Sequence, residues 1–577
     1  MLNFDFIHIL DKHQKFLQKK CKTENIFLVW WSVRDLILDI NKKPTDIDFT
    51  MSWKPVDIYE KIDKKDLSHF ITEKFGTITL IPKHKKVQYE LTPLRTENEY
   101  SDNRHPEKIN RQDDILLDSN RRDFSINCIY YFSTKISKIS IWHRNLKKKN
   151  IYDLDQVQDS LKKHKILFYQ DQNLLIIQDH KIISKLFPKS QFNSDFAIYL
   201  LDIIKEVFSH KKQFAQDTIR IIVDPHMWIQ DLAKKKIKCV WDPDKRFTED
   251  ALRIIRALRF VSVLNQKLKD NSKKNQKIQL FDVDTETRSA LKSHKDLVQN
   301  VAKERIKDEV QKTFVSGDPF SLISLLQEVW LLSYIFPALS ETMGVDQPVR
   351  YHPFDTYAHT ILTLYELQKI NKDYLVRFAM LYHDVWKVEQ YAAYDKSLDR
   401  GEIREILAWP LNHRNSGPEL AKKDLANLWF SKNEIKDISR YIAKHHVPGE
   451  ILDAKPENRS KKLRKLYSEA WFEKVNSLLD IAIADRLGQY NPMQNSSDIT
   501  DVEDLRKILK NLKKKEWQFT SKDLKVDWKI IMEYFQIPPS SKVWDLLNQA
   551  MERVLSDVKT RNNKEKILKY LKWYIKQ

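Results

Sequence analysis

Apolar residues follow different periods in the first part of this chain and in the remainder. Residues 1–20 have the spacing of a short helix, and the runs 26–30 and 46–50 are rich in the apolar and β-branched residues typical of strands. Residues 76–94 predict a hairpin. From about residue 248 onward, apolar residues recur every three to four positions. The pattern therefore predicts a small α/β sheet followed by an almost wholly helical chain.

Three other segments are less regular. Residues 33–40 have helical spacing, whereas residues 96–122 are polar without a clear period and predict a mobile loop. Residues 134–219 combine lysine-rich strands with an amphipathic helix near 196–208. This last segment interrupts the predicted sheet, and the sequence assigns it no function.

Length and composition narrow the class of protein. A chain of 577 residues is too long for one core and predicts three to five domains. No apolar run reaches the roughly 18 residues of a membrane helix, and the first residues lack the apolar core of a signal peptide. The three cysteines are dispersed, so neither a disulfide framework nor a zinc–thiolate site is predicted. We expect a cytoplasmic protein without membrane contact.

The formal net charge is +20, which favours a polyanionic partner such as a nucleic acid. The alternative is a lysine bias from an AT-rich genome, because lysine, asparagine and isoleucine are all abundant. Charge alone leaves both explanations open.

Two carboxylates close together are the first candidate chemistry. Asp46 and Asp48 are one residue apart, and on a strand that spacing directs both side chains to the same face. Such a pair can hold Mg²⁺, which would activate a 3′ hydroxyl and hold a triphosphate. Glu90, on a following strand, is a candidate third carboxylate. Solvated surface pairs of this kind are common, so the motif alone is weak.

The neighbouring residues carry a family resemblance. The stretch 26–50 resembles the start of class II nucleotidyltransferases of the DNA polymerase β superfamily, which include tRNA CCA-adding enzymes and bacterial poly(A) polymerases. Their pattern is LVGGxVRD followed by DxD. Further stretches at 89–106, 120–131, 223–232, 242–260 and 301–314 resemble later motifs of the family in the same order. Beyond the carboxylates, the resemblance implies a role near nucleotide for Trp30, Trp31, Arg34, Asp35, Arg95, Arg104, Arg121, Arg122, Asp123, Asn127, Glu249, Asp250, Arg253 and Arg256.

The resemblance implies that the segment Glu249–Arg253 selects the nucleotide. On a helix, Asp250 and Arg253 would share a face, so that the carboxylate could accept from an exocyclic amino group while the guanidinium donates to a ring acceptor. Together they would read a base edge and favour C and A. The alternative is an ordinary surface salt bridge between residues three apart.

Glycine is scarce and tryptophan abundant. The chain has 7 glycines and 15 tryptophans, whereas average usage gives about 40 glycines in this length. Trp30 and Trp31 replace two family glycines where the backbone must approach phosphates. Tryptophan also stands at apparent glycine places at residues 228, 241, 330, 386, 528 and 544, and Met227 at another. We hypothesise that many are glycine in the cell, through a codon such as UGA; the alternative is genuine indoles and lost catalysis.

A second candidate site combines histidines and aspartates. Imidazoles and carboxylates spread over several helices are a credible set of metal ligands. Their order resembles the HD phosphohydrolase superfamily, with Trp386 where a glycine is usual. The resemblance implies that His359, His383, Asp384 and Asp485 bind a first divalent metal, with His413 and one of His445 and His446, preferably His446, near a second. A metal-bound water could then attack a phosphate ester.

The predicted fold class is α+β: a small N-terminal nucleotidyltransferase head followed by mostly helical neck, HD and tail domains. The expected boundaries are 1–133 and 220–262 for the head, 134–219 for an insertion, 263–345 for the neck, 346–495 for the HD domain and 496–577 for a basic tail. This domain order resembles HD-containing CCA-adding enzymes. It predicts addition of CCA to tRNA from CTP and ATP, with Mg²⁺ at the head and a further divalent metal at the HD site.

The sequence leaves other functions open. The chain could be a poly(A) polymerase or add only CC or only A, or it could be an inactive RNA-binding protein if Trp30 and Trp31 are genuine. The substrate and metal of the HD site and the oligomeric state stay open.

Overall fold

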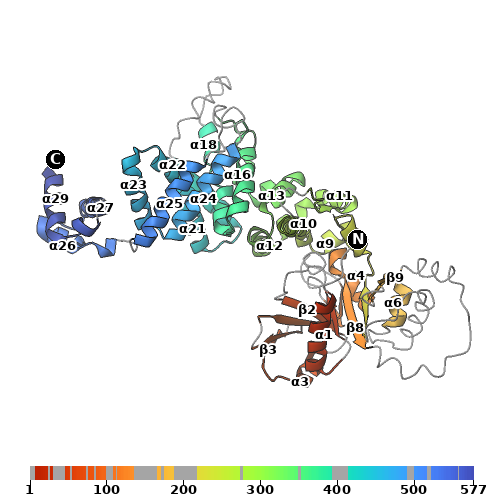
Figure 1. Ribbon diagram of the computed structural model, residues 1–577. Helices are drawn as coiled ribbons and strands as arrows, with labels where there is room; N and C mark the ends of the chain where they lie inside the picture. Colours follow the sequence, from red (N-terminus) through yellow and green to blue (C-terminus); the bar gives the residue numbers. More distant parts are fainter. Residues whose placement is uncertain are drawn as a thin grey trace, which may run out of the picture. The chain divides into compact units, whose positions relative to one another are not determined.

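The computed structural model describes most of the chain in two units, residues 1–317 and 318–577 (Figure 1). The described residues are 7–23, 26–29, 46–51, 55–72, 76–83, 86–98, 108–111, 114–135, 166–169, 174–187, 218–272, 277–347, 353–392, 413–489, 499–515, 521–555 and 558–576. The division after residue 317 falls inside the predicted neck, residues 263–345. None of the helices in these ranges combines the length and apolarity that spanning a bilayer requires.

A mixed nine-stranded sheet forms the head of the first unit. Its order is β3-β4-β5-β2-β1-β8-β11-β10-β9. These strands are β1 (Ile26–Val29), β2 (Asp46–Met51), β3 (Leu67–Thr72), β4 (Thr77–Pro82), β5 (Gln88–Pro93), β8 (Tyr130–Lys135), β9 (Ile166–Tyr169), β10 (Leu174–Ile177) and β11 (Thr218–Val223). β2 runs parallel to β5 and antiparallel to β1. The predicted strands and the hairpin β4–β5 are confirmed.

Helix α1 (Ile7–Cys21) covers one face of this sheet, as the sequence predicted a helix near the start. Polar groups buried beneath it are paired. Asp11 forms an ion pair of 2.7 Å with Arg220 of β11 and accepts from the hydroxyl of Tyr131 at 2.6 Å. Gln14 donates to the carbonyl of Ile26 at 2.8 Å. These bonds fix the helix on the sheet, because leaving any of the buried groups unpaired would be costly.

The opposite face carries an apolar core beneath α4 (Ile115–Asn120) and α6 (His180–Leu186). Phe27 and Val29 of β1 belong to this core, and Phe27 pairs with Thr50 across the antiparallel ladder. Residues paired across a ladder share a face, and side chains alternate along a strand. The side chains of Asp46 and Asp48 therefore lie on the face opposite α1.

One predicted segment of the head differs from the structure. Residues 96–122 are not one irregular loop, because β6 (Arg95–Asn98) pairs with β7 (Lys108–Arg111) and α4 follows. Strands β9 and β10 of the predicted insertion extend the sheet of the head, with β10 parallel to β11. The helices expected at 33–40 and near 196–208 lie outside the described residues.

Helices complete the first unit. They are α8 (Trp228–Ala233), α9 (Pro243–Glu249), α10 (Leu252–Asn271), α11 (Thr285–Ser293) and α12 (Lys303–Ser316), and the short parallel strands β12 (Lys236–Ile237) and β13 (Asp282–Val283) lie among them. Glu309 of α12 forms an ion pair with Arg259 of α10, and both side chains are buried. This pair joins α10 to α12.

The second unit is helical in all its described elements, as predicted. Its elements are α13 (Pro319–Glu328), α14 (Leu332–Ile335), α15 (Pro337–Ser340), α16 (Thr356–Ile370), α17 (Tyr374–Leu381), α18 (Lys387–Ala392), α20 (His413–Asn427), α21 (Lys432–Lys444), α22 (Val447–Leu452), α23 (Pro456–Glu469), α24 (Phe472–Gln489), α25 (Thr500–Lys515), α26 (Trp528–Phe535), α27 (Ser541–Leu555), α28 (Val558–Arg561) and α29 (Lys564–Lys576). Helices α16 and α24 pack together, and the C-terminal helices have an apolar core of their own.

Candidate functional sites

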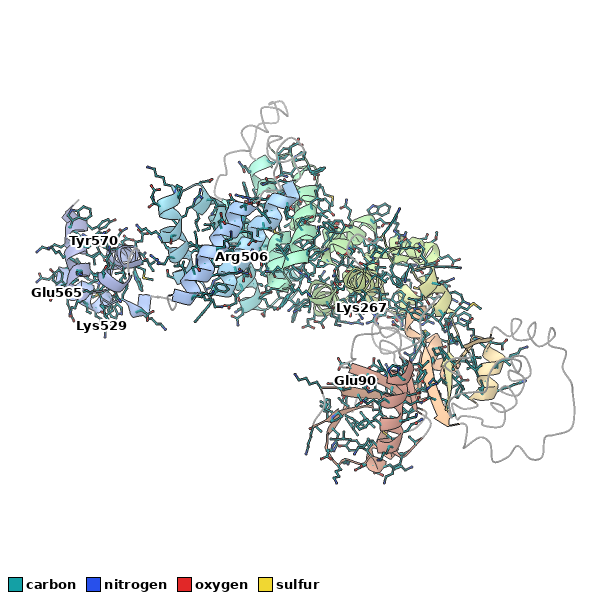
Figure 2. The ribbon with its side chains drawn as sticks, in the orientation of Figure 1. Glu90, Lys267, Arg506, Lys529, Glu565 and Tyr570 are labelled. Carbon is teal, nitrogen blue, oxygen red and sulfur yellow. The ribbon has the colours of Figure 1, made fainter. Side chains whose placement is uncertain are left out.

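The parallel strands β2 and β5 bring two of the predicted carboxylates together. Asp48 lies directly opposite Glu90, and Asp46 lies opposite Gln88 on the same face. The amide of Gln88 donates to Glu90 at 2.9 Å. Asp46 is exposed, whereas Asp48 and Glu90, which is labelled in Figure 2, are half-buried. The strands thus place all three carboxylates on one face, as the spacing predicted.

Arginines face this acidic edge across a cavity of about 270 Å³. Asp48, Glu90, Thr50 and Thr92 line one part of it, and the other part is lined by Arg95, Arg121 and Arg122. Carboxylates beside guanidinium groups can bind a cation and a polyanion next to each other, because each attracts the opposite charge. A nucleoside triphosphate with its Mg²⁺ has this combination of charges.

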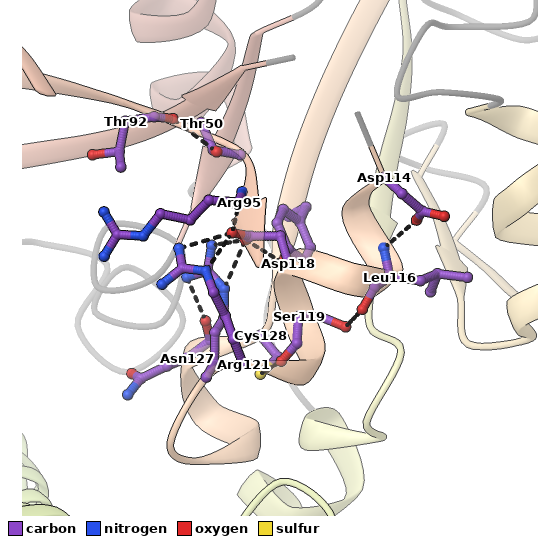
Figure 3. Close-up of polar contacts among 12 residues, drawn as sticks. Thr50, Thr92, Arg95, Asp114, Leu116, Asp118, Ser119, Arg121, Asn127 and Cys128 are labelled. Atoms are coloured by element: carbon purple, nitrogen blue, oxygen red, sulfur yellow. Dashed lines mark hydrogen bonds and ion pairs between the residues drawn. The ribbon is translucent and has the colours of Figure 1, made fainter. Parts of the chain in front are cut away.

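A buried carboxylate, Asp118, holds the arginines (Figure 3). It accepts from Arg121 at 2.8 Å, from Arg122 at 2.5 Å and from the hydroxyl of Tyr130 at 2.9 Å. Burial alone would raise the pKa of Asp118, but the charges and hydrogen bonds of the two arginines bring it well below its usual range. Asp118 therefore stays ionised and positions the guanidinium groups. The sequence analysis did not identify it.

Three residues of the RRDFSIN motif make structural contacts. Asp123 accepts from the amide of Asn127 and from Arg256 of α10, each at 2.7 Å, while Arg122 donates to the carbonyl of Asn127. Burial would raise the pKa of Asp123, yet Arg256 and Asn127 lower it to about 2. This network links the sheet to α10. Of the motif's residues named here, only Arg121 and Arg122 also line the acidic cavity.

The expected base-reading pair is not formed as predicted. Asp250 lies in extended conformation between α9 and α10, where it accepts from the backbone nitrogen of Leu252 and pairs with Arg305 at 2.9 Å. Arg253 instead pairs with Glu249 at 2.6 Å. The prediction that Asp250 and Arg253 share a helix face is therefore wrong, because α10 begins only after Asp250.

Several predicted nucleotide residues cannot be placed. Trp30, Trp31, Arg34, Asp35 and Arg104 lie outside the described residues. The turn after β11 is described. There Asp224, fully buried, accepts from the backbone nitrogens of Trp228 and Ile229 and from Gln178 of the insertion. A larger cavity of about 720 Å³ lies beside this turn, away from the acidic edge, and its lining includes His180, His226 and Trp241.

The second unit gathers the predicted histidines and aspartates into one cluster. The Nε2 atoms of His359 on α16 and His383 after α17 are 3.3 Å apart. The carboxylate of Asp485 on α24 lies 3.0 Å from His359, and that of Asp384 lies 3.4 Å from His383. Among the described residues, His359, His383 and Asp384 form the set whose ligand atoms all lie within 4.8 Å of one another. The head carboxylates do not approach this closely.

The geometry of this cluster suits a metal ion. His383 donates from Nδ1 to the carbonyl of Met380 at 2.7 Å, which leaves Nε2 as the acceptor facing the cluster. Burial opposes ionisation of Asp384, but the charges of His383 and Lys387 keep its pKa far below the usual range. Both histidines are buried, whereas Asp485 is 31 % exposed and opens the cluster to solvent.

Gly488 permits the contact that builds the cluster. It lies about one turn beyond Asp485 on α24, against Thr363, which lies one turn beyond His359 on α16. A Cβ atom at residue 488 would overlap the Thr363 side chain and lie 2.8 Å from its backbone nitrogen. The two helices can therefore approach closely only because residue 488 has no side chain.

The consecutive residues His445 and His446 contact different groups. The ring of His445 lies 5.4 Å from that of His383, whereas His446 lies 3.3 Å from Glu450. Of the two, His445 is the one whose ring contacts His383, and the assignment of either to a second metal stays a prediction. The side chain of His413 lies outside the described residues.

Comparison with known proteins agrees with this arrangement. Residues 26–167 match the model of the poly(A) polymerase head domain, and residues 280–343 match that of the probable RNA- and SrmB-binding site of polymerase A. The crystal structure of the Bacillus stearothermophilus CCA-adding enzyme in complex with CTP is similar at a TM-score of 0.55 and 17% identity, covering 96% of this chain and 93% of that one. An apo CCA-adding enzyme structure (form II) is similar at a TM-score of 0.50 and 14% identity, covering 99% of each chain.

The acidic sheet edge and the helices after it thus define a nucleotidyltransferase head with an RNA-binding region. The chain therefore carries a poly(A) polymerase head domain and the probable RNA-binding region of polymerase A.

Proposed function

We propose that this chain adds C and A nucleotides to the 3′ end of tRNA, using CTP and ATP. The observation that carries the proposal is the pairing of Asp48 with Glu90 beside Arg95 and Arg121, in a head of this family. The likeness to CCA-adding enzymes along nearly the whole chain supports CCA addition over the poly(A) polymerase alternative.

The acidic edge fits Mg²⁺ by the chemistry of its donors. Asp46, Asp48 and Glu90 offer oxygen ligands on one face of two adjacent strands, and Mg²⁺ prefers carboxylate oxygens. These three residues would hold the metal, which would neutralise the triphosphate and lower the pKa of the 3′ hydroxyl.

The protein's own residues would orient the substrates. Arg95 and Arg121 line the cavity and would donate to phosphate oxygens, for which the planar guanidinium is well suited. Asp118 keeps Arg121 in place through the Nε bond of 2.8 Å. A pre-positioned guanidinium costs little reorganisation when the charge on the phosphates shifts during transfer.

The partner would be tRNA, recognised through its phosphates. The net charge of +20 and the match of residues 280–343 to an RNA-binding region both support a polyanionic RNA. Binding of this kind weakens steeply with salt, because counterions are released on association. We expect the protein to act in the cytoplasm.

The test is incorporation of labelled CTP and ATP into tRNA that ends before CCA, in the presence of Mg²⁺. Because residues 30 and 31 are expected to lie beside the phosphates, the chain is assayed with tryptophan and with glycine at both positions. Addition of three nucleotides supports the proposal. An unlimited A tail would instead identify a poly(A) polymerase, and RNA binding without incorporation in either form would identify an inactive RNA-binding protein.

We also propose a divalent metal site and phosphohydrolase activity at the cluster of His359, His383, Asp384 and Asp485. The supporting observation is the approach of two buried imidazole nitrogens to two ionised carboxylates, one in the turn after α17 and one on α24. These residues would hold the metal, which would supply an activated water. The test is hydrolysis of a chromogenic phosphodiester with added Mn²⁺ or Zn²⁺, before and after chelation. Metal binding without hydrolysis would retain the site and reject the activity.

A further inference from the structure

Three tryptophans have backbone conformations that L-residues rarely adopt. The φ angles are +60° at Trp241, +60° at Trp330 and +62° at Trp429. In this left-handed region the Cβ atom crowds the following carbonyl, and a bulky residue there is an outlier, whereas glycine adopts it freely. The backbone at these three positions is that of a glycine.

The end of α13 shows why glycine is needed at residue 330. The backbone nitrogen of Trp330 donates to the carbonyl of Gln327 at 3.0 Å, and that of Leu331 donates to Leu326 at 2.8 Å. These two bonds define a Schellman motif, which satisfies the last carbonyls of a helix. The motif requires a left-handed residue at the position that Trp330 occupies, and glycine is the usual one.

The end of α20 repeats the same geometry. Trp429 donates to the carbonyl of Ala426, and Phe430 donates to that of Leu425, both at 3.0 Å. This second Schellman motif again has tryptophan at its left-handed residue. Trp429 was not among the glycine places inferred from the family pattern, so its backbone supports the same conclusion independently.

The indoles at these three positions contribute little to the core. Trp241, Trp330 and Trp429 are 55 %, 63 % and 62 % exposed. Trp241 precedes the helix cap Asp242, and its indole donates to Asn120 at the surface. Little apolar burial therefore compensates for the conformational strain.

We propose that residues 241, 330 and 429 are glycine in the native protein, because their codon is translated as glycine in the cell and as tryptophan under another code. The composition supports this: the chain has only 7 glycines, and a protein of this length uses about 40. A single codon read in two ways accounts for part of the glycine shortage, for the surplus of tryptophan and for the backbone at all three positions.

Other tryptophans differ in ways that limit the proposal. Trp228 and Trp386 are buried, and Trp528 and Trp544 begin or lie within helices; none of the four has a positive φ. Their backbone accepts any residue, so the structure gives no support there to the glycine places inferred from the family pattern. Trp30 and Trp31 lie outside the described residues.

The direct test reads the gene and the protein made by the native cells. We expect UGA at codons 241, 330 and 429, and mass spectrometry of the corresponding native peptides should show the mass of glycine at each. UGG, which is read as tryptophan, at any of the three codons would overturn the proposal. So would tryptophan in any of the three native peptides.

A second test measures the strain in the chain as printed. Trp330→Gly and Trp429→Gly should each raise the Tm of the second unit, by about 2–4 °C, because they relieve left-handed strain. The matched control is Trp544→Gly, which changes an indole of similar exposure (65 %) inside helix α27 and should lower the Tm. A lower Tm for both variants at 330 and 429 would contradict the proposal.

Discussion

The two candidate sites of this chain use acidic residues in opposite ways. In the head, Asp48 and Glu90 lie on adjacent strands beside a cavity that arginines also line. In the second unit, Asp384 and Asp485 lie against two buried imidazoles. The first arrangement borders a cavity of about 270 Å³, and the second is a compact set of imidazole and carboxylate groups.

The difference shows how burial and charge decide what a carboxylate can do. Asp118 and Asp384 are buried and stay ionised because cations contact them: two arginines in the first case, Lys387 and the histidines in the second. Asp424, which is also buried, accepts from the backbone nitrogen of Ala338 and the hydroxyl of Tyr382, and burial raises its pKa to about 6. A buried carboxylate therefore keeps its charge where cations contact it and loses it more readily where they do not.

The largest expected effect is a loss of nucleotide incorporation that leaves metal binding by the His–Asp cluster unchanged. Asp48→Ala should lower nucleotide incorporation on the order of 10³-fold, because a metal contributes several kcal/mol to charge stabilisation in such a transfer. Metal binding by the His–Asp cluster should be unchanged. The control is Asp57→Ala, an exposed aspartate on α3 (Pro55–Lys61) of the same head. Equal losses in both variants would mean that Asp48 has no special role.

The second effect is a loss of folding stability when the arginines lose the counter-charge of Asp118. Asp118→Asn should lower the free energy of unfolding of the head by about 3–5 kcal/mol, because Arg122 would be left buried without a counter-charge. Urea denaturation measures the loss. The pKa of Asp118 is lowered on folding, so its contribution is present at neutral pH and is lost as the pH falls below about 4. Glu419→Gln, in an exposed pair with Lys422, should cost less than about 0.5 kcal/mol.

The third effect tests the other site. His383→Ala should weaken divalent metal binding by about 100-fold or more, because it removes a nitrogen that faces both carboxylates. Calorimetric titration with Mn²⁺ or Zn²⁺ measures it. The matched control is His446→Ala, which changes a neighbouring histidine that contacts Glu450 instead. Unchanged affinity in the His383 variant would remove the cluster from the list of metal sites.

The smallest effect is a dependence on pH. Asp424 has a folded pKa of about 6, above the value of about 3.9 in an unfolded chain. Its ionisation therefore destabilises the folded unit above pH 6, and this cost disappears as the pH falls toward 4. Asp424→Asn should stabilise the second unit by about 2 kcal/mol at pH 8 and by nearly nothing at pH 4. An equal difference at both pH values would contradict the assigned pKa.

Much of the acidic edge could be predicted from sequence because strand periodicity determines it. Asp46 and Asp48 had to share a face once residues 46–50 formed a strand, and Glu90 followed on the paired strand. Asp118 was missed although its spacing gave a signal. It precedes Arg121 and Arg122 by three and four residues, the separation at which helical side chains meet.

Other assignments depended on details that periodicity does not contain. Asp250 stands two residues before the apolar start of α10, and an aspartate there caps the helix more readily than it joins it. His445 and His446 are consecutive at the end of α21, so only the fold could decide which of them faces His383.

The central claim is that the acidic edge of the head transfers nucleotides to tRNA. Its most direct test is to sequence the 3′ ends formed from tRNA lacking CCA, given CTP, ATP and Mg²⁺, with glycine at residues 30 and 31 and either Asp48 or alanine. We expect tRNA ending in CCA with Asp48 and unextended tRNA with alanine. Unextended tRNA in both, or CCA ends in both, would contradict it.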